Sequence, residues 1–233
     1  MEYTTAKMRD KIRICEKTGK EMHTFFLTPA EVQEIMHLLR GYEYTLSGGF
    51  EEAERRMVVI GNDNADLENY LTVIRVESFQ KPLTHRSVLG SVLGLGMKRE
   101  MIGDIIVKDK ICDIIIIQEM KKYILNELHK VGSQKVEVYE VKLTDLLQLE
   151  DSKEVRTLSV ASLRVDALIS VAFGISREKS SLLVTQEKVL VNFLPCTNQA
   201  KAIKEEDLIS VRGFRKSEGS RSCAEKHEKA ECE

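Results

Sequence analysis

The sequence predicts an α+β fold in several small parts, and three observations support this prediction. Amphipathic helical patterns with their own capping residues alternate with short strands rich in Val and Ile. Residues 143–158 carry a charged stretch that suits a linker, and we place the boundary between parts at residues 151–156. Of the 233 residues, 42% are hydrophobic, which is enough to fill real cores. We therefore expect folded parts at 1–78, 79–150 and 156–216, followed by a disordered polar tail at 217–233.

The first part begins with two helices. Residues 4–17 have the pattern of a polar amphipathic helix, and the segment LTPAEVQEIMHLLRG predicts a second. In that segment Thr28 is the expected N-cap, Pro29 the first helical residue and Glu31 the partner that completes a capping box. Gly41 is expected to end the helix. After the turn-like LSGGFEEAE, the runs RRMVVIG and NYLTVIRVES predict two strands, which makes this part a small α+β unit.

The second part predicts a helix, a strand, a turn, a strand, a helix and a strand in that order, with the turn at Asp109 and Lys110. The second helix carries an apolar stripe through Met120, Ile124 and Leu128 and is expected to end at Gly132. We therefore predict a two-layer domain, with helices on one face of a sheet that can share strands with the first part.

The first helix of this second part, at residues 84–95, is followed by two cations, Lys98 and Arg99. Two interpretations of them remain open, because they can be ordinary surface charges or contacts to RNA. Gly90 and Gly94 lie four residues apart, so we expect them to permit close packing against a neighbouring element.

Cations are concentrated in the middle and C-terminal parts of the chain. Residues 81–142 contain 11 Lys and Arg against 8 Asp and Glu, and residues 156–216 contain 10 against 6, although the formal net charge of the whole chain is −2. A basic block in a near-neutral chain is typical of a polyanion partner, but surplus cations often only solvate a surface.

The third part places cations at the start of a helix, where the helix dipole disfavours them. The run SLRVDALISVAFG predicts a helix capped by Ser162 and ended by Gly174, and Ser176 can cap a second helix. Arg177 and Lys179 lie in the first turn of the second helix, where each cation costs about a few tenths of a kcal/mol. Because a helix N-terminus presents free N–H groups to anions, the added cations indicate a phosphate-binding site.

An Arg-x-Asp helix start, a Ser-Arg helix start, a Val-x-Val-Asn strand and a closing Asp-x-Ile strand follow one another in this third part. They fall on Arg164 and Asp166, Ser176 and Arg177, residues 189–192 and residues 207–209. In this order they resemble the S4 RNA-binding domain, over residues 158–214. The resemblance implies that the domain grips the phosphate backbone of structured RNA. The RNA-binding residues expected are Arg164, Ser176, Arg177, Lys179, Lys188, Asn192 and Arg212, with Lys98 and Arg99 as candidates in the second part.

Three residues depart from the S4 pattern. Glu187 stands where the pattern usually has Gly, Ser180 replaces a common Ala, and Glu206 replaces the Gly of the closing turn. Two carboxylates thus occupy the places of small neutral residues, so we expect a change in affinity or footprint. Asp166 is expected to orient Arg164 or to hold the helix start rather than to contact RNA.

The segments THRSVLGSVLGLGMKREMIGDIIV, FLTPAE and SGGFEEAERR resemble the bacterial YlmH family, so the similarity extends to about residue 214. The resemblance implies an N-terminal α+β unit, a central ferredoxin-like or RRM-like domain and a C-terminal S4 domain. It also implies association with the large ribosomal subunit, particularly with stalled subunits that carry peptidyl-tRNA, and an older association with cell division. Because the aromatic content is 6% and there is no Trp, we expect shape and phosphate recognition to dominate over base stacking.

The sequence predicts no catalytic residue, no cofactor and no metal site. His85 has no nucleophile and carboxylate arrangement near it, and in GLGMKREMIG Arg99 occupies the third-glycine position of a dinucleotide fingerprint. Cys223, His227 and Cys232 cluster in the tail but offer only three ligands. No stretch approaches the roughly 18 apolar residues of a membrane helix, and no apolar stretch like a signal peptide is present, so we expect a cytoplasmic protein with no membrane partner.

We therefore expect a non-enzymatic, monomeric factor that binds structured rRNA on the large ribosomal subunit, with tRNA as a further candidate. Two other hypotheses remain open. The first is an RNA-modifying enzyme targeted by an S4 domain, which is disfavoured because no Gly-Arg-Leu-Asp-type segment of the pseudouridine synthases is present. The second is a protein-interaction factor in cell division, which predicts normal function after charge reversal at Arg177 and Lys179.

Overall fold

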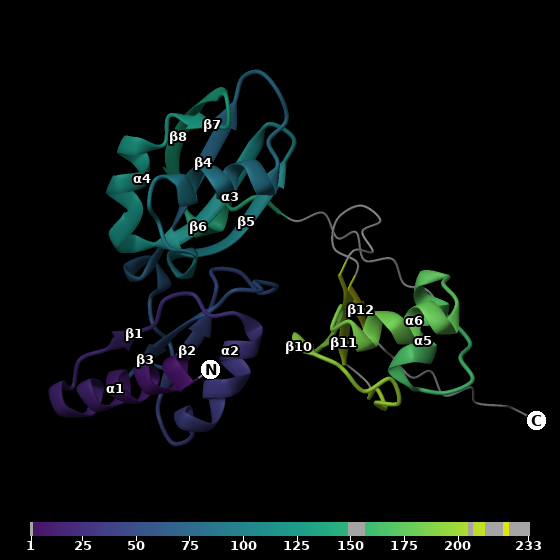
Figure 1. Cartoon of the computed structure of the whole chain (residues 1–233). Helices are drawn as coiled ribbons and strands as arrows, with labels where there is room; N and C mark the ends of the chain where they lie inside the picture. Colours follow the sequence, from purple (N-terminus) through teal and green to yellow (C-terminus); the bar gives the residue numbers. More distant parts are fainter. Residues whose placement is uncertain (1, 149–156, 205–206, 213–220, 224–233) are drawn as a thin grey trace, which may run out of the picture. The chain divides into compact units, whose positions relative to one another are not determined.

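The computed structural model describes residues 2–148, 157–204, 207–212 and 221–223. They fall into two compact units, Met1–Asp151 and Ser152–Glu233, and each is described by itself. Helices and strands carry the labels of Figure 1. Over the described residues, none of the helices combines the length and the apolar character that crossing a membrane requires.

The N-terminal part of the first unit packs helices against a small sheet. The helix α1 (Glu2–Thr18) contacts α2 (Pro29–Ile35), which continues as the 3-10 helix η1 (Met36–Leu39). The strands β1 (Met22–His23), β2 (Tyr44–Ser47) and β3 (Met57–Ile60) form an antiparallel sheet in the order β1-β3-β2. Both predicted helices are therefore confirmed.

The start of α2 follows from its sequence. The Thr28 hydroxyl accepts a hydrogen bond from the Glu31 backbone N–H (3.3 Å), and the Glu31 carboxylate accepts one from the Thr28 N–H (2.7 Å). This reciprocal pair is the predicted capping box, and it satisfies two N–H groups that a helix start otherwise leaves without partners. Gly41, at a φ of 87°, lies two residues beyond η1, which ends at Leu39.

The middle of the chain forms a five-stranded antiparallel sheet with two helices. The chain passes from the 3-10 helix η2 (Leu67–Asn69) through β4 (Leu71–Ser78), α3 (His85–Gly94), η3 (Arg99–Met101) and β5 (Ile102–Lys108). It continues through β6 (Ile111–Ile117), η4 (Gln118–Met120), α4 (Lys121–Glu127), β7 (Lys130–Val131), β8 (Gln134–Val141) and η5 (Leu143–Asp145). The strand order is β5-β6-β4-β8-β7 (Figure 1). Four of its strands and both helices follow the β-α-β-β-α-β connectivity of split β-α-β folds.

Three predictions for this part need correction. The sequence pattern assigns β4 to the end of the N-terminal part, but β4 pairs with β6 and β8 of the central sheet, which is the sharing of strands between the two parts that the sequence allowed. Gly132 is the predicted end of the second helix, but α4 ends at Glu127 and Gly132 occupies the β7–β8 turn at a φ of 60°. Gly90 and Gly94 face open space, with no atom within 4 Å of the point where a Cβ would lie, so they do not serve close packing.

The five-stranded sheet is covered on both faces. On one face, Val88 and Val92 of α3 and Ile124 of α4 pack against Ile74 and Ile114. The other face contributes a second apolar cluster with the N-terminal part; the buried members of this cluster are Phe26, Met57, Leu71, Val73, Ile115 and Ile117. The N-terminal part therefore rests on the sheet face that the helices leave uncovered.

The turn that precedes β3 depends on a glycine. A Cβ at Gly48 would lie 2.3 Å from the Arg55 carbonyl oxygen and 2.5 Å from the Ala53 Cβ. The backbone at Arg55 cannot easily move away, because the Arg55 N–H donates to the Asp104 carboxylate at 3.2 Å. This close approach explains a glycine at this position.

We expect Gly48→Ala to lower the free energy of unfolding of the first unit by about 1–3 kcal/mol, because overpacking forces the backbone to shift. Urea denaturation followed by circular dichroism measures the change. Gly90→Ala is the matched control: it lies on the exposed side of α3 with open space around it, so it should stabilise the unit by up to about 1 kcal/mol. A Gly48→Ala variant as stable as the parent would show that the turn can open.

The second unit packs two short helices against a sheet. The helices are α5 (Val165–Phe173) and α6 (Arg177–Thr185). The strands are β9 (Val189–Val191), β10 (Leu194–Pro195), β11 (Leu208–Val211) and β12 (Arg221–Cys223), in the order β10-β9-β11-β12. The buried core of the unit includes Val165, Ile169, Val184, Val191 and Ile209.

The predicted ends of the two helices are confirmed except at one position. Arg164 rather than Ser162 is the N-cap of α5, because the Arg164 carbonyl accepts the first helical bonds, from the N–H groups of Ala167 and Leu168. Gly174 ends α5 at a φ of 62°, and the Ile175 N–H turns back to the Ser170 carbonyl at 3.0 Å. Ser176 caps α6 as predicted.

Part of the predicted disordered tail is a strand, because residues 221–223 pair with β11. The rest of the predicted tail lies outside the described residues, as do Glu206 and most of the cluster of Cys223, His227 and Cys232.

Candidate nucleic-acid interface

A buried carboxylate organises the start of α5. The two oxygens of Asp166 accept hydrogen bonds from the Arg164 guanidinium at 3.0 and 3.1 Å, and an Arg177 nitrogen lies 3.7 Å from the second oxygen. The Asp166 side chain is only 6% exposed, whereas those of Arg164 and Arg177 are 45% and 56% exposed. The expected role of Asp166 in orienting Arg164 is confirmed. The sequence did not indicate that the same carboxylate also faces Arg177 of the next helix.

The crossing of α5 and α6 is fixed by a second polar contact. The Ser180 hydroxyl is buried and donates to the Asp166 backbone carbonyl at 2.6 Å. At the start of α6, the Ser176 hydroxyl accepts from the Lys179 backbone N–H at 3.2 Å. Ser176 is thus engaged as a cap, and Ser180 links the two helices where an alanine could not.

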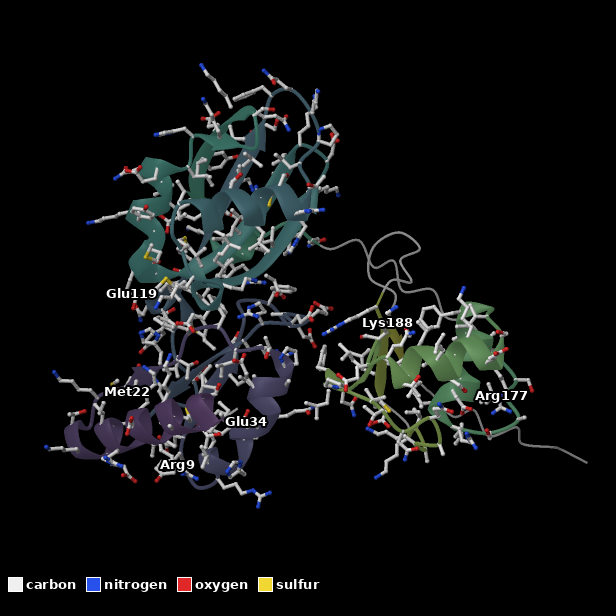
Figure 2. The ribbon with its side chains drawn as sticks, viewed as in Figure 1. Arg9, Met22, Glu34, Glu119, Arg177 and Lys188 are labelled. Atoms are coloured by element: carbon white, nitrogen blue, oxygen red, sulfur yellow. The ribbon has the colours of Figure 1, made fainter. Side chains whose placement is uncertain are left out.

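Lys188 and Arg212 form a separate group. The Arg212 backbone N–H donates to the Lys188 carbonyl at 2.7 Å, so these two exposed residues lie side by side at the start of β9 and the end of β11. Arg177 begins α6 and Lys188 follows its C-terminal end, which separates them by the length of a nine-residue helix, about 13 Å. Figure 2 shows Arg177 and Lys188 well apart on the unit. The predicted phosphate-binding residues therefore form two groups on this unit.

Asn192 has a structural role that the prediction did not foresee. Its amide nitrogen donates to the Asp207 carboxylate at 2.7 Å, and its amide oxygen accepts from the Leu208 backbone N–H at 2.9 Å. Asn192 also adopts a φ of 50° in the β9–β10 turn, a region that Asn tolerates better than most residues. Asn192 therefore ties β9 to β11 through both polar groups of its side chain, and its contact to RNA stays a prediction.

The Asp207 carboxylate is held by several donors. A hydrogen bond from the Lys204 backbone N–H, then the one from Asn192, lower the pKa of Asp207 below its usual range. A carboxyl whose pKa is lowered by folding stabilises the fold above its unfolded pKa, and this contribution is lost as the pH falls through the folded pKa. The β9–β11 connection should therefore weaken in acid.

Glu187 occupies a strained position. Its φ is 56°, in the left-handed region where the Cβ of an L-residue crowds the backbone. The S4 pattern has Gly at this position, and the backbone geometry gives the physical reason, because Gly adopts a positive φ without penalty. Glu187 also places an exposed carboxylate next to Lys188.

We expect Glu187→Gly to raise the free energy of unfolding of the second unit by about 0.5–1 kcal/mol and to tighten RNA binding, because it removes both the strain and the carboxylate. Thermal denaturation and a salt titration of RNA affinity measure the two effects. Glu187→Gln is the control, since it removes the charge and keeps the strain. If Glu187→Gly were no more stable than Glu187→Gln, strain at this residue would be excluded.

Lys98 and Arg99 lie in the first unit and differ from each other. Lys98 is exposed and stays a predicted contact to RNA. An Arg99 nitrogen donates to the carbonyl oxygens of Ile102 and Gly103 at 2.5 and 3.1 Å. Burial, together with nearby Arg55, lowers the pKa of Arg99 to about 10. Arg99 thus holds the chain at η3 through one guanidinium nitrogen, and its contact to RNA stays a prediction.

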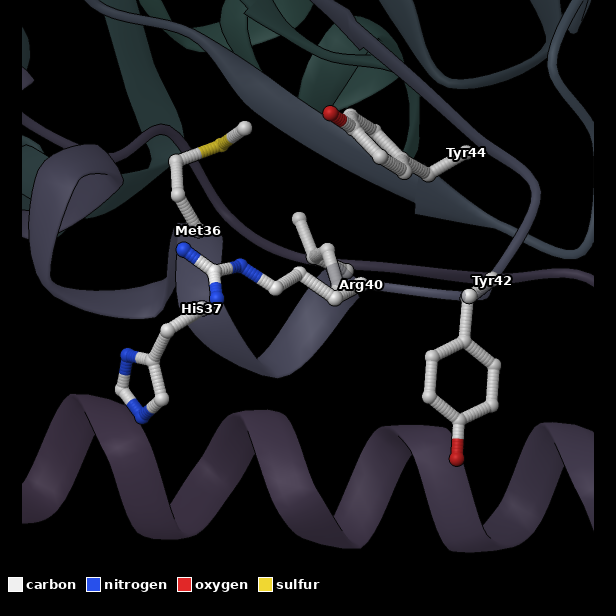
Figure 3. A pocket seen from close by; sticks show the side chains of 7 residues that line it. Met36, His37, Arg40, Tyr42 and Tyr44 are labelled. Carbon is white, nitrogen blue, oxygen red and sulfur yellow. The ribbon is translucent and has the colours of Figure 1, made fainter.

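A hollow of about 390 Å³ lies beside η1, and Figure 3 shows it from close by. The residues that line it are Met36, His37, Leu39, Arg40, Gly41, Tyr42 and Tyr44. These lining residues include no carboxylate that could pair with His37 as an acid–base partner. Among the residues that the structure describes, no group of three or more His, Cys, Asp and Glu could hold a metal ion.

Two family models, one relative and one solved structure are similar to this chain. A family model described as "YlmH, N-terminal" matches residues 2–65, and one described as "Putative RNA-binding domain in YlmH" matches residues 63–145. A Bacillus subtilis protein named ribosome-associated protein quality control protein P2 is 30% identical over 210 residues, which cover 87% of this chain and 81% of that protein. A solved structure titled cell division protein ylmH from Streptococcus pneumoniae superposes with a TM-score of 0.57 at 20% identity. It covers 63% of this chain and 94% of that one, and it shows likeness of fold.

Proposed function

This chain belongs to the YlmH family, and from that premise we propose that it is a ribosome-associated RNA-binding protein. In this proposal the second unit is an S4 domain that binds structured rRNA of the large ribosomal subunit, including subunits that carry peptidyl-tRNA. The protein acts without catalysis, cofactor or metal, as a monomer in the cytoplasm, within ribosome-associated quality control.

The observation that carries this proposal is the pair of arginines held by Asp166. A guanidinium can bind a phosphate through two parallel N–H donors, but only if its plane is oriented. Asp166 binds Arg164 through both oxygens and draws Arg177 of the neighbouring helix to the same point, while about half of each guanidinium side chain stays exposed. Lys179, two residues after Arg177 in the first turn of α6, adds a further exposed cation. This arrangement suits the phosphate backbone of folded RNA, which positions a protein without reading bases.

The sheet of the central domain is not available for stacking RNA bases, which favours recognition of RNA shape. RRM domains stack bases on aromatic residues of the two middle strands. Here the middle strands are β4 and β6, and their outer face carries the ion pair of Arg75 and Asp113 and the apolar cluster shared with Phe26 and Met57. That face is therefore occupied by protein, and any RNA contact of this domain must use another surface.

Sedimentation of the tagged protein through a sucrose gradient of its own cell lysate tests the proposal. The parent should migrate with free large subunits, and the triple variant Arg164→Ala, Arg177→Ala, Lys179→Ala should stay at the top, because it lacks the phosphate contacts. A control triple variant, Lys20→Ala, Lys122→Ala, Lys142→Ala, removes three exposed lysines of the first unit and should migrate like the parent. If the phosphate-site variant also migrated with large subunits, the S4 proposal would be wrong.

A further inference from the structure

One end of the central domain brings three loops together. The strand register places Glu77 opposite Ile111 and Ser78 opposite Val136, so the β4–α3 loop, the β5–β6 turn and the β7–β8 hairpin meet at the same end of the sheet. In Figure 1 this is the end of the teal domain at which β7 and β8 meet. We call residues 79–83, 108–110 and 130–135 the basic end.

Hydrogen bonds hold the basic end in one arrangement. The Ser78 and Leu83 backbone N–H groups each donate at 2.8 Å to carbonyl oxygens of the β5–β6 turn, at Lys110 and Asp109. On the other side, the Ser78 hydroxyl and the Lys81 backbone N–H donate to the Gln134 side-chain oxygen at 2.8 and 2.9 Å. The β4–α3 loop is therefore fixed by both neighbouring segments, which makes a preformed surface.

The charge of the basic end is strongly positive. Its three segments contain five lysines and one acidic residue, Asp109. All five lysines are exposed; they are Lys81, Lys108, Lys110, Lys130 and Lys135. Lys130 and Lys135 lie directly opposite each other in the β7–β8 hairpin, a placement that like charges disfavour. Local stability therefore does not explain this concentration of cations, but an anionic partner does.

The first of these three segments also carries an exposed aromatic ring. Phe79 is 67% exposed, the highest value of any large hydrophobic side chain in the described residues. It begins the loop that the hydrogen bonds fix, so its backbone is held while its ring faces solvent. A ring beside lysines offers a surface on which an unpaired base can stack while its phosphates meet the cations.

We propose that the basic end binds a single-stranded stretch of RNA, with Phe79 stacking on one unpaired base and the lysines contacting the flanking phosphates. This surface is distinct from the sheet face that RRM domains use and from the Asp166 site of the second unit. The proposal rests on the proposed function only in taking RNA as the anionic partner.

Fluorescence gives a direct test, because the chain contains no Trp. Phe79→Trp introduces a single indole, and titration with an unstructured oligouridine should quench its emission as a base stacks on it.

Phe79→Ala should weaken binding of the same oligouridine, end-labelled and measured by anisotropy, by about 5- to 150-fold. The triple variant Lys110→Ala, Lys130→Ala, Lys135→Ala should reduce the slope of log affinity against log salt by about 2. The control triple variant at Lys20, Lys122 and Lys142 should leave both quantities unchanged.

The outcomes separate this proposal from the function proposed for the second unit. The Phe79→Trp protein should also be tested with Arg164, Arg177 and Lys179 changed to Ala. Quenching by oligouridine that persists in this combined variant supports an independent site at the basic end. Normal anisotropy in both basic-end variants would overturn the inference, whatever the sedimentation result for the second unit. A loss of binding to phosphatidylglycerol vesicles, with RNA binding unchanged, would also overturn it and would assign the surface to a membrane instead.

Discussion

Arg75→Ala should lower the free energy of unfolding of the first unit by about 3–5 kcal/mol, because it leaves the carboxylate of Asp113 buried without its counter-ion. Asp113 lies in the middle of β6 and is 0% exposed. Arg75 reaches it from β4 with two hydrogen bonds, of 2.7 and 2.8 Å, and this pairing raises the pKa of Arg75. Urea denaturation of the full chain measures the loss.

The contacts around this pair explain the size of the effect. The second Asp113 oxygen also accepts from the Leu147 backbone N–H at 2.7 Å, and the Arg75 guanidinium donates to the Asp145 carbonyl at 2.7 Å. The pair thus fastens the chain after β8 across the sheet face. Removing Arg75 also breaks its hydrogen bond to the Asp145 carbonyl. Water cannot readily reach the Asp113 carboxylate to replace the lost guanidinium.

A double variant separates burial of a charge from loss of packing. Arg75→Met with Asp113→Leu removes both charges and keeps apolar volume, so it should recover most of the stability that Arg75→Ala loses. If the double variant were as unstable as Arg75→Ala, the shape of the site rather than its charge would control the stability. A loss below about 1 kcal/mol for Arg75→Ala would show that water reaches Asp113 after all.

The features that the sequence predicted well depend on neighbours in the chain. The capping box of Thr28 and Glu31, the cap at Ser176 and the turn at Gly174 each involve residues within a few positions. Local hydrogen-bonding chemistry is sufficient to specify such features, so a short motif identifies them. The same is true of the role of Asp166 toward Arg164, two residues away.

The features that were missed depend on contacts between distant residues. β4 has the pattern of a strand, but nothing in that pattern shows that β6 and β8 are its partners. Arg99 and Asn192 are residue types that bind RNA, but the sequence did not indicate that one nitrogen of Arg99 donates to the Ile102 and Gly103 carbonyls or that the Asn192 amide donates to the Asp207 carboxylate. Whether a polar side chain faces solvent or a partner within the fold is decided by tertiary packing, which spacing alone does not reveal.

Asp166→Asn should weaken RNA binding of the second unit by about tenfold, although it removes a negative charge from the binding surface. Each guanidinium that must be ordered on binding loses about 0.5–1.5 kcal/mol of affinity, and Asp166 orders two of them before RNA arrives. In asparagine, the amide nitrogen is a donor that must face guanidinium donors, so the arrangement cannot be kept. The unit should also lose about 1–3 kcal/mol of stability, because hydrogen bonds to a charged group are removed.

The sign of the change in affinity decides between two physical accounts of Asp166. If the carboxylate acted only through its long-range charge, its removal would raise the local positive potential and RNA would bind more tightly. If it acts by positioning Arg164 and Arg177, binding weakens while the salt dependence, which counts phosphate contacts, falls. Asp63→Asn, at an exposed aspartate of the first unit, makes the same change in net charge and controls for it. The affinities are measured below the melting temperature of every variant. Tighter binding by Asp166→Asn than by Asp63→Asn would refute the positioning role.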